Sequence, residues 1–262
     1  MFYEKPQQIS FIVMGAQRSG HASIQHALSQ HPQLKLVAQE QQGYFADDAI
    51  FAIGNPCSSS YEEICRTTTS EQICGEVSNA YFHHPEAIAR INRYNPSIKL
   101  VVILRNPADR AYSHLQHVVN RGRKEPSLSI SLNEDLFSST SSTHQSTRDS
   151  EYISKSKYSE QISYLRQYFD PHQLLFIKSE DLRDDTEVML YQIFQFLNVP
   201  YLDVDTSAQN LGNYEQSIPT DCYNRIINTV KGDINETEQL LGWDCRDWKQ
   251  LKQLDQEHMK AF

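Results

Sequence analysis

Cysteine is scarce in this sequence, and its distribution excludes several kinds of site. The 262 residues include five cysteines, no two with the CxxC spacing of a zinc site or redox pair: Cys57, Cys65, Cys74, Cys222 and Cys245. An odd and dispersed set is not typical of a disulfide framework. We therefore expect reduced thiols, as in cytosolic proteins.

Long apolar runs are also absent. No stretch reaches the roughly 18 apolar residues that a membrane-spanning helix needs. The first residues, Met1 to Gln8, are polar and lack the apolar core of a signal peptide. These absences predict a cytoplasmic protein that has no membrane as a partner.

An excess of positive charge is missing as well. The chain has 24 Lys and Arg against 33 Asp and Glu, which gives a formal net charge of -9. Nucleic acids and anionic membranes bind basic surfaces, so neither is expected as a partner. The acidity either serves solubility or suits a cationic small molecule. No feature of the sequence fixes the oligomeric state.

Short apolar runs indicate the fold. Three of them are typical of buried parallel strands: 11–14, 100–104 and 174–177. Helical patterns accompany them at 23–29, from Pro107 onward, and at 158–169, 187–197 and 221–241. Alternating strands and helices predict a single α/β domain, residues 1–262, with a central parallel sheet flanked by helices. The Ser- and Thr-rich stretch 121–150 is either a mobile insertion over the active edge of the sheet or a disordered loop.

The first motif follows the first predicted strand. Gly15 and Gly20 enclose four residues just before a helix, a turn in which backbone N–H groups converge on an anion. An ATP-binding P-loop would continue with Lys and then Ser or Thr, but His21 and Ala22 stand there, so Mg²⁺ loses its usual hydroxyl ligand. Arg18 places a fixed charge inside the loop. We expect a phosphate that is held without a metal.

The second motif follows the second predicted strand, where ligands of open α/β sheets bind. Arg105 directly follows this strand, and its guanidinium can bind a phosphate through two N–H bonds. Ser113 lies eight residues further and can donate its hydroxyl to the same phosphate. Together the two motifs predict a ligand with two separate phosphate groups.

These residues resemble the sulfotransferases that use PAPS (3′-phosphoadenosine 5′-phosphosulfate). The loop 15–23 is similar to their 5′-phosphosulfate loop, and 101–113 is similar to their 3′-phosphate motif almost residue for residue. Further similar stretches lie at 75–81, 84–86, 179–182, 194–197 and 240–248. The resemblance covers nearly the whole chain and is closest to bacterial members with the heparan-sulfate sulfotransferase type of fold.

The resemblance implies a P-loop-like domain that moves a sulfuryl group by metal-free in-line displacement. PAPS would be the donor, 3′-phosphoadenosine 5′-phosphate (PAP) the product, and a hydroxyl or amine of a small molecule or oligosaccharide the acceptor. Arg105 and Ser113 would bind the 3′-phosphate. The 5′-phosphosulfate would contact the loop residues Gln17, Arg18, Ser19, Gly20, His21, Ala22 and Ser23.

The resemblance also implies three catalytic residues. In this branch a Glu ahead of an aromatic pair is the general base, and Glu40 fits that place, although one extra residue of spacing leaves Gln41 as the alternative. Arg18, where the family usually has Lys, keeps the charge that stabilises the leaving phosphate. His21 replaces the usual Thr and supplies a donor if protonated. Val77 stands where several members have a Lys that stabilises sulfuryl charge.

Several residues carry two interpretations. Glu76 is the second candidate for the base, although the resemblance favours a positioning role. His114 and His117 share a helix face and either reach the acceptor or are partly buried. Four aromatic residues either shape an acceptor pocket or pack in the core: Tyr44, Phe45, Tyr81 and Phe82.

Two other functions stay open at this point. A metal-dependent kinase is disfavoured by His21 and Ala22. A non-catalytic protein that binds PAPS or another nucleotide is motivated by Val77 and His21.

Overall fold

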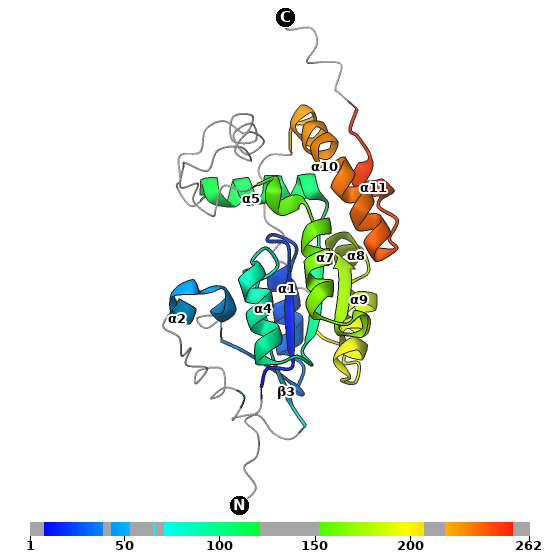
Figure 1. Cartoon of the computed structure of the whole chain (residues 1–262). Helices are drawn as coiled ribbons and strands as arrows, with labels where there is room; N and C mark the ends of the chain where they lie inside the picture. Colours follow the sequence, from blue (N-terminus) through cyan, green and yellow to red (C-terminus); the bar gives the residue numbers. More distant parts are fainter. Residues whose placement is uncertain are drawn as a thin grey trace, which may run out of the picture. The chain divides into compact units, whose positions relative to one another are not determined.

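The computed structural model describes residues 8–38, 43–52, 65, 71–120, 152–206 and 218–253. The chain divides into two compact units. The first takes in residues 1–104 and 164–211, and the second takes in 105–163 and 212–262. Figure 1 draws the chain coloured by residue number, with helix and strand labels. The single domain expected from the sequence stays a prediction, and the stretch 121–150 lies outside the described residues.

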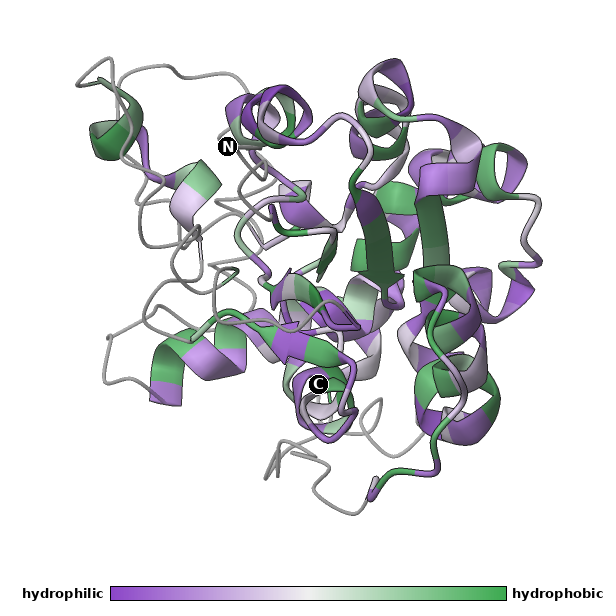
Figure 2. Ribbon diagram, turned by 90° about the horizontal axis from the view of Figure 1, so that it is seen from below, coloured by the Kyte–Doolittle hydropathy of each residue, from purple (hydrophilic) through white to green (hydrophobic). Residues whose placement is uncertain are grey.

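A five-stranded parallel sheet with the order β2-β3-β1-β4-β5 forms the centre of the first unit. The strands are β1 Phe11–Gly15, β2 Leu34–Leu36, β3 Ile73–Val77, β4 Lys99–Leu104 and β5 Leu174–Lys178. The three predicted strands correspond to β1, β4 and β5, whereas β2 and β3 were not predicted. Figure 2 shows the strands as hydrophobic and the surrounding helices as mixed.

The first unit also contains helices, some of which pack against the sheet. The helices are α1 His21–Ser29, α2 Asp48–Ala52, α4 Pro85–Tyr94, α8 Ser179–Asp184 and α9 Thr186–Leu197, with short 3-10 turns η2 Tyr44–Ala46 and η5 Pro171–Gln173. α1, α8 and α9 bury apolar side chains against the strands in one cluster, which includes Phe11, Ile24, Ile103, Leu182 and Phe194. Every residue of β1 is buried, so both faces of the central strand are covered. The predicted α/β fold with a central parallel sheet flanked by helices is confirmed.

The strand order changes direction between β1 and β4. β1 and β4 are neighbours, with Gly15 opposite Ile103. β1 leads through α1 to β2 on one side of this pair, whereas β4 leads to β5 on the other side. In open α/β sheets, ligands bind beyond the carboxyl ends of strands at such a switch point. The two sequence motifs follow these two strands.

The second unit is helical in its described part. It contains α5 Pro107–Asn120, η4 Ser154–Ser156, α10 Thr220–Leu241 and α11 Arg246–Lys249, and α7 Ser159–Tyr168 crosses the boundary between the units. The predicted helix at Pro107 and the predicted helix 221–241 are confirmed by α5 and α10. Arg110 of α5 is fully buried, where its Nε donates to Ser156 Oγ (2.6 Å) and its guanidinium also donates to the Tyr152 carbonyl.

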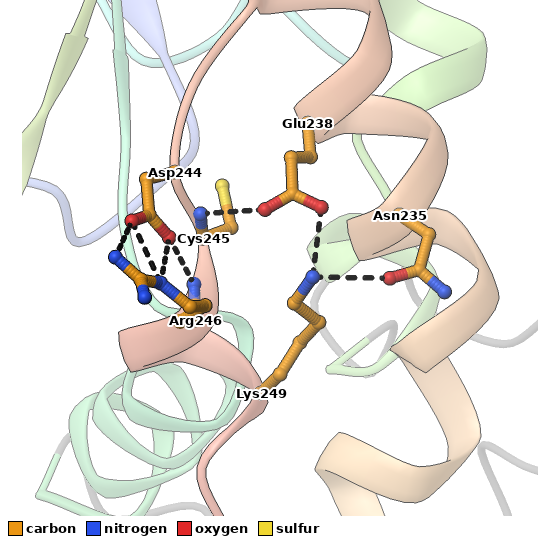
Figure 3. A network of polar contacts seen from close by, with 6 residues as sticks. All are labelled: Asn235, Glu238, Asp244, Cys245, Arg246 and Lys249. Carbon is orange, nitrogen blue, oxygen red and sulfur yellow. Dashed lines mark hydrogen bonds and ion pairs between the residues drawn. The ribbon is translucent and has the colours of Figure 1, made fainter.

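A polar network closes the corner between α10 and α11 (Figure 3). The Glu238 carboxylate accepts from Lys249 Nζ at 2.7 Å and from the Cys245 backbone N–H at 2.9 Å. Arg246 pairs with Asp244, its Nε lying 2.8 Å from Oδ2. The two Glu238 contacts hold α11 and its buried Trp248 against α10, whereas the Arg246–Asp244 pair lies within the turn that leads into α11.

Candidate functional site

The loop between β1 and α1 has the backbone of an anion-binding turn. Gly15 (φ 135°), Arg18 (φ 72°) and Gly20 (φ 101°) all have positive φ. At Arg18 this conformation costs about 1–2 kcal/mol, because a Cβ crowds the carbonyl oxygen there. Gly20 is the N-cap of α1 and has no side chain to accept from the first-turn N–H groups. These groups and the positive end of the helix dipole are therefore available to an anion.

Two buried polar atoms of this loop have no hydrogen-bond partner within the described part of the chain. They are Ser19 Oγ, in a residue that is 0% exposed, and His21 Nε2. A buried hydroxyl without a partner costs roughly 1–3 kcal/mol, so native proteins rarely retain one without a reason. A bound oxyanion that accepts from Ser19 gives such a reason, so the residues of this loop fit a phosphate or a phosphosulfate.

His21 is held in its neutral form. Burial lowers the pKa of its imidazole to about 4, against a hydrogen bond with the Met14 backbone that raises the pKa. The ring is therefore neutral at pH 7. Its expected role as a protonated donor requires a nearby anion, which would raise the pKa again.

This pKa predicts an acid-sensitive fold. The unfolded His21 has a pKa near 6.5, so the unfolded chain binds more protons between that pH and about 4. The stabilising contribution is thus complete above about pH 6.5 and is lost as the pH falls toward 4. Between about pH 7.5 and about pH 5, we expect wild type to lose about 2 kcal/mol more unfolding free energy than His21→Gln, measured by urea titration. Equal losses in the two proteins would contradict the buried neutral imidazole.

The second motif lies at the start of the second unit. Arg105 is half-buried and precedes α5 by two residues, and Ser113 is 1% exposed within α5. The Asn106 side-chain oxygen accepts from the N–H groups of Ala108 (3.0 Å) and Asp109 (3.3 Å), so Asn106 caps α5. The binding of one phosphate by both Arg105 and Ser113 stays a prediction.

The remaining predicted donor-site residues belong to the loop and the first turn of α1. Ala22 is exposed, whereas Gln17, Arg18 and Ser23 are half-buried. The loop buries the Ser19 hydroxyl and the Nε2 atom of His21 and leaves the Ala22 position to solvent. Their contacts with a donor stay predictions.

A buried carboxylate anchors the segment that follows the expected base. Glu76, on β3, is 0% exposed. Its Oε1 accepts from the Gly43 backbone N–H at 2.8 Å, and both of its oxygens accept from the Tyr81 hydroxyl at 2.7 and 2.8 Å. Gly43 (φ 90°) begins the turn into η2. Because both oxygens are occupied, Glu76 is better suited to hold this segment than to accept a proton.

Comparison with known proteins identifies the family. The sulfotransferase domain family matches residues 8–261. The chain belongs to this family. The predicted resemblance is thereby confirmed, and the metal-dependent kinase is not favoured.

Similar sulfotransferases include two curated relatives. A Caenorhabditis elegans protein named bifunctional heparan sulfate N-deacetylase/N-sulfotransferase 1 is 25% identical over 196 residues, or 74% of this chain and 22% of that protein. The mouse heparan sulfate glucosamine 3-O-sulfotransferase 5 is 26% identical over 189 residues, or 72% of this chain and 53% of that protein. The chain thus spans about a fifth and about half the length of these two relatives.

A solved structure shares the fold. The sulfotransferase from Alicyclobacillus acidocaldarius has a TM-score of 0.78 and 22% identity, covering 93% of this chain and 99% of that one. In the described part of this sulfotransferase domain, no helix is long and apolar enough to cross a membrane. The same residues contain no group of three or more His, Cys, Asp or Glu that could hold a metal ion.

Val77 and Glu40 stand at two positions that the family resemblance singles out. Val77 is 2% exposed and packs in the apolar cluster with Phe11 and Val13, so this β3 position directs an apolar group into the core. Glu40 and its alternative Gln41 lie outside the described residues. Their role as base stays a prediction, whereas the anchor at Gly43 is visible.

The aromatic residues proposed for the acceptor are mostly core residues. Phe45, Tyr81 and Phe82 are at most 2% exposed, which supports the packing interpretation. Tyr44 is half-buried. Arg90 of α4 fixes this region, since its Nη1 donates to the Phe45 carbonyl at 2.8 Å and its guanidinium carbon lies 4.3 Å from the Phe51 ring centroid.

The histidines of α5 also fit packing. His114 is 5% exposed and makes an edge contact with Tyr152, with ring centroids 5.1 Å apart. His117 is half-buried.

One hydrogen bond to the second motif could not be predicted from the sequence. The Tyr158 hydroxyl donates to the Arg105 carbonyl oxygen at 2.8 Å across 53 residues of chain. In the sequence Tyr158 is only the first residue of a helical pattern. A hydrogen bond between residues this far apart in the chain produces no recognisable local sequence pattern.

Proposed function

We propose that this chain transfers a sulfuryl group from PAPS to a hydroxyl or amine of a small-molecule or oligosaccharide acceptor, without a metal, and releases PAP. The observation that carries the proposal is the Ser19 hydroxyl, which is buried without a partner among the described residues. It lies in a positive-φ loop ahead of an uncapped helix N-terminus at the switch point of the sheet. Membership of the sulfotransferase domain family supports the same reading.

Donor binding, stabilisation of the leaving phosphate and removal of the acceptor proton are assigned to different residues. The loop amides, Ser19 and the dipole of α1 would hold the 5′-phosphosulfate, and Arg105 and Ser113 would hold the 3′-phosphate. Arg18 would stabilise the negative charge that develops on the leaving phosphate. Glu40, or the residue in its register, would take the proton of the acceptor. Glu76 keeps the segment after this base in place through Gly43.

We further propose a neutral or cationic acceptor in the cytoplasm. The two curated relatives are named for heparan sulfate, a polyanion. This chain has a formal net charge of -9, which opposes the approach of a polyanionic glycan.

The test is transfer of labelled sulfate from PAPS to an acceptor panel. The panel contains small amines and alcohols, neutral oligosaccharides and heparan sulfate, with EDTA present to remove divalent metals. Label on a neutral or cationic acceptor together with release of PAP is the expected result. A parallel reaction contains ATP and Mg²⁺ without EDTA, and transfer of phosphate there, together with no transfer of sulfate from PAPS, would contradict the proposal.

The second candidate is a protein that binds PAPS without catalysis. The observation that favours it is Val77, which occupies a family lysine position and is buried in the core. Tight binding of PAP without any transfer from PAPS would select this candidate.

Glu76→Gln separates acceptor chemistry from donor binding. The amide keeps the size of the side chain but removes its negative charge, so the hydrogen bonds from Gly43 and Tyr81 no longer go to a charged acceptor. A hydrogen bond to a charged group contributes about 1.5–3 kcal/mol, so we expect kcat/KM for the acceptor to fall about tenfold or more. The dissociation constant of PAP, measured by calorimetry, should stay within about twofold. Equal weakening of donor binding would contradict a role on the acceptor side.

A further inference from the structure

We propose that Tyr158 is a positioning residue for Arg105, and that Tyr223 supports the same turn through Asn106. The two tyrosine hydroxyls hold the backbone from which the Arg105 guanidinium extends. This inference rests on the proposed function, since Arg105 there binds the 3′-phosphate of the donor. It adds residues that contact the donor only through Arg105 and Asn106.

The first contact fixes the Arg105 carbonyl. Tyr158 is 0% exposed, and its hydroxyl donates to the Arg105 carbonyl oxygen at 2.8 Å. Arg105 lies between the last residue of β4 and the first residue of α5. The backbone at Arg105 belongs to neither element, and the hydroxyl of Tyr158, 53 residues later in the chain, supplies a hydrogen bond to its carbonyl.

Tyr158 is itself held firmly. Asp233 of α10 accepts from the backbone N–H of Tyr158 at 2.6 Å, and from the N–H and hydroxyl of Ser159 at 3.0 and 2.6 Å. The Tyr158 ring packs edge-on against Trp248, with centroids 6.0 Å apart. Trp248 belongs to α11, which the network of Figure 3 holds against α10. The hydroxyl is thus presented by a rigid support that the ring and backbone maintain without it.

The second contact fixes the next residue. Asn106 Nδ2 donates to the Tyr223 hydroxyl at 3.0 Å, while its Oδ1 caps α5. The orientation of this side chain sets the first turn of α5, the helix that contains Ser113. Tyr223 is 5% exposed and lies on α10, so one helix supports both contacts through Asp233 and Tyr223.

Loss of these tyrosine hydroxyls should affect only the binding of the 3′-phosphate of the donor. Arginine has a long side chain with high rotamer entropy. Bidentate binding of a phosphate therefore requires that the backbone of the arginine is fixed to within a fraction of an ångström. Loss of the Tyr158 hydroxyl leaves the ring packing and the Asp233 contacts intact but releases the carbonyl. Donors that carry a 3′-phosphate should therefore bind less tightly, whereas ligands without it should bind as before.

The experiment compares PAP with adenosine 5′-phosphate by calorimetry in wild type, Tyr158→Phe and Tyr223→Phe. Tyr158→Phe is expected to weaken PAP binding about fivefold, equal to about 1 kcal/mol, and to leave adenosine 5′-phosphate binding within about twofold. In turnover, KM for PAPS should rise by the same factor with kcat unchanged. The matched control is Tyr164→Phe, which removes a hydroxyl that lies 3.1 Å from that of Tyr168; it should change neither constant.

The possible results separate the positioning role of Tyr158 from the proposed use of PAPS as the donor. If wild type binds PAP no better than adenosine 5′-phosphate, the proposed donor is wrong. If wild type prefers PAP and Tyr158→Phe keeps the full preference, the positioning role is wrong. If Tyr158→Phe fails to fold, Tyr223→Phe decides by the same ratio: a reduced preference for PAP supports the inference, and an unchanged one overturns it.

Discussion

Arg18→Ala is expected to reduce kcat for sulfuryl transfer by roughly 100-fold. The guanidinium is the fixed charge of the loop, whereas His21, with its pKa lowered to about 4 by burial, is neutral at pH 7 before a donor binds. A charge that stabilises the leaving phosphate acts mainly in the transition state, so PAP affinity should fall less than kcat. Single-turnover kinetics with labelled PAPS measures this split.

Two matched variants separate charge from backbone strain at position 18. Arg18→Lys keeps the cation and should retain most of the activity. Arg18→Gly loses the cation but relieves the positive φ of 72°, so it should be as slow as Arg18→Ala and more stable by about 1 kcal/mol. A fully active Arg18→Ala would show that the leaving charge is stabilised elsewhere.

Gly15→Ala is expected to destabilise the fold by about 4 kcal/mol or to prevent folding. A Cβ at this position would lie 2.2 Å from the carbonyl oxygen of Ile103, which is backbone of the neighbouring strand and cannot rotate away. The φ of 135° adds strain for any residue with a side chain. The loop therefore depends on glycine both to turn and to approach β4.

The control for this variant is Gly232→Ala. Gly232 lies within α10, and a Cβ there meets no atom within 4 Å among the described residues. Alanine is the better helix former, so this variant should gain about 0.5–1 kcal/mol. Urea unfolding of both proteins gives the comparison. A Gly15→Ala protein as stable as wild type would contradict the close packing of the loop against β4.

The sequence predicted the strands that contain an uninterrupted apolar run of four or five residues. β1, β4 and β5 each contain such a run, and its pattern was sufficient. β3 was missed because Gly75 and Glu76 interrupt its apolar run. Both are explained only by tertiary contacts, since a Cβ at Gly75 would lie 2.3 Å from the Phe11 ring and Glu76 is paired with Tyr81 and Gly43. β2 has three residues, too few for a periodic signal.

The candidate site was predictable where it follows strand ends. The loop after β1 and the Arg105 position after β4 could be found because turn glycines and strand ends leave local patterns. The anchoring of Gly43 by Glu76, the neutral state of His21 and the Tyr158 contact could not be found. Each depends on burial or on hydrogen bonds between residues far apart in the chain.

The most direct measurement is a calorimetric comparison of three ligands with the wild-type chain: PAP, adenosine 5′-phosphate and ATP with Mg²⁺. Two phosphate sites for one nucleotide predict that PAP binds at least about tenfold more tightly than adenosine 5′-phosphate, because Arg105 adds a charged bidentate contact. PAP should also bind without any divalent metal. Equal affinity for the two adenosine nucleotides, or a preference for ATP that depends on Mg²⁺, would contradict a donor held by both motifs.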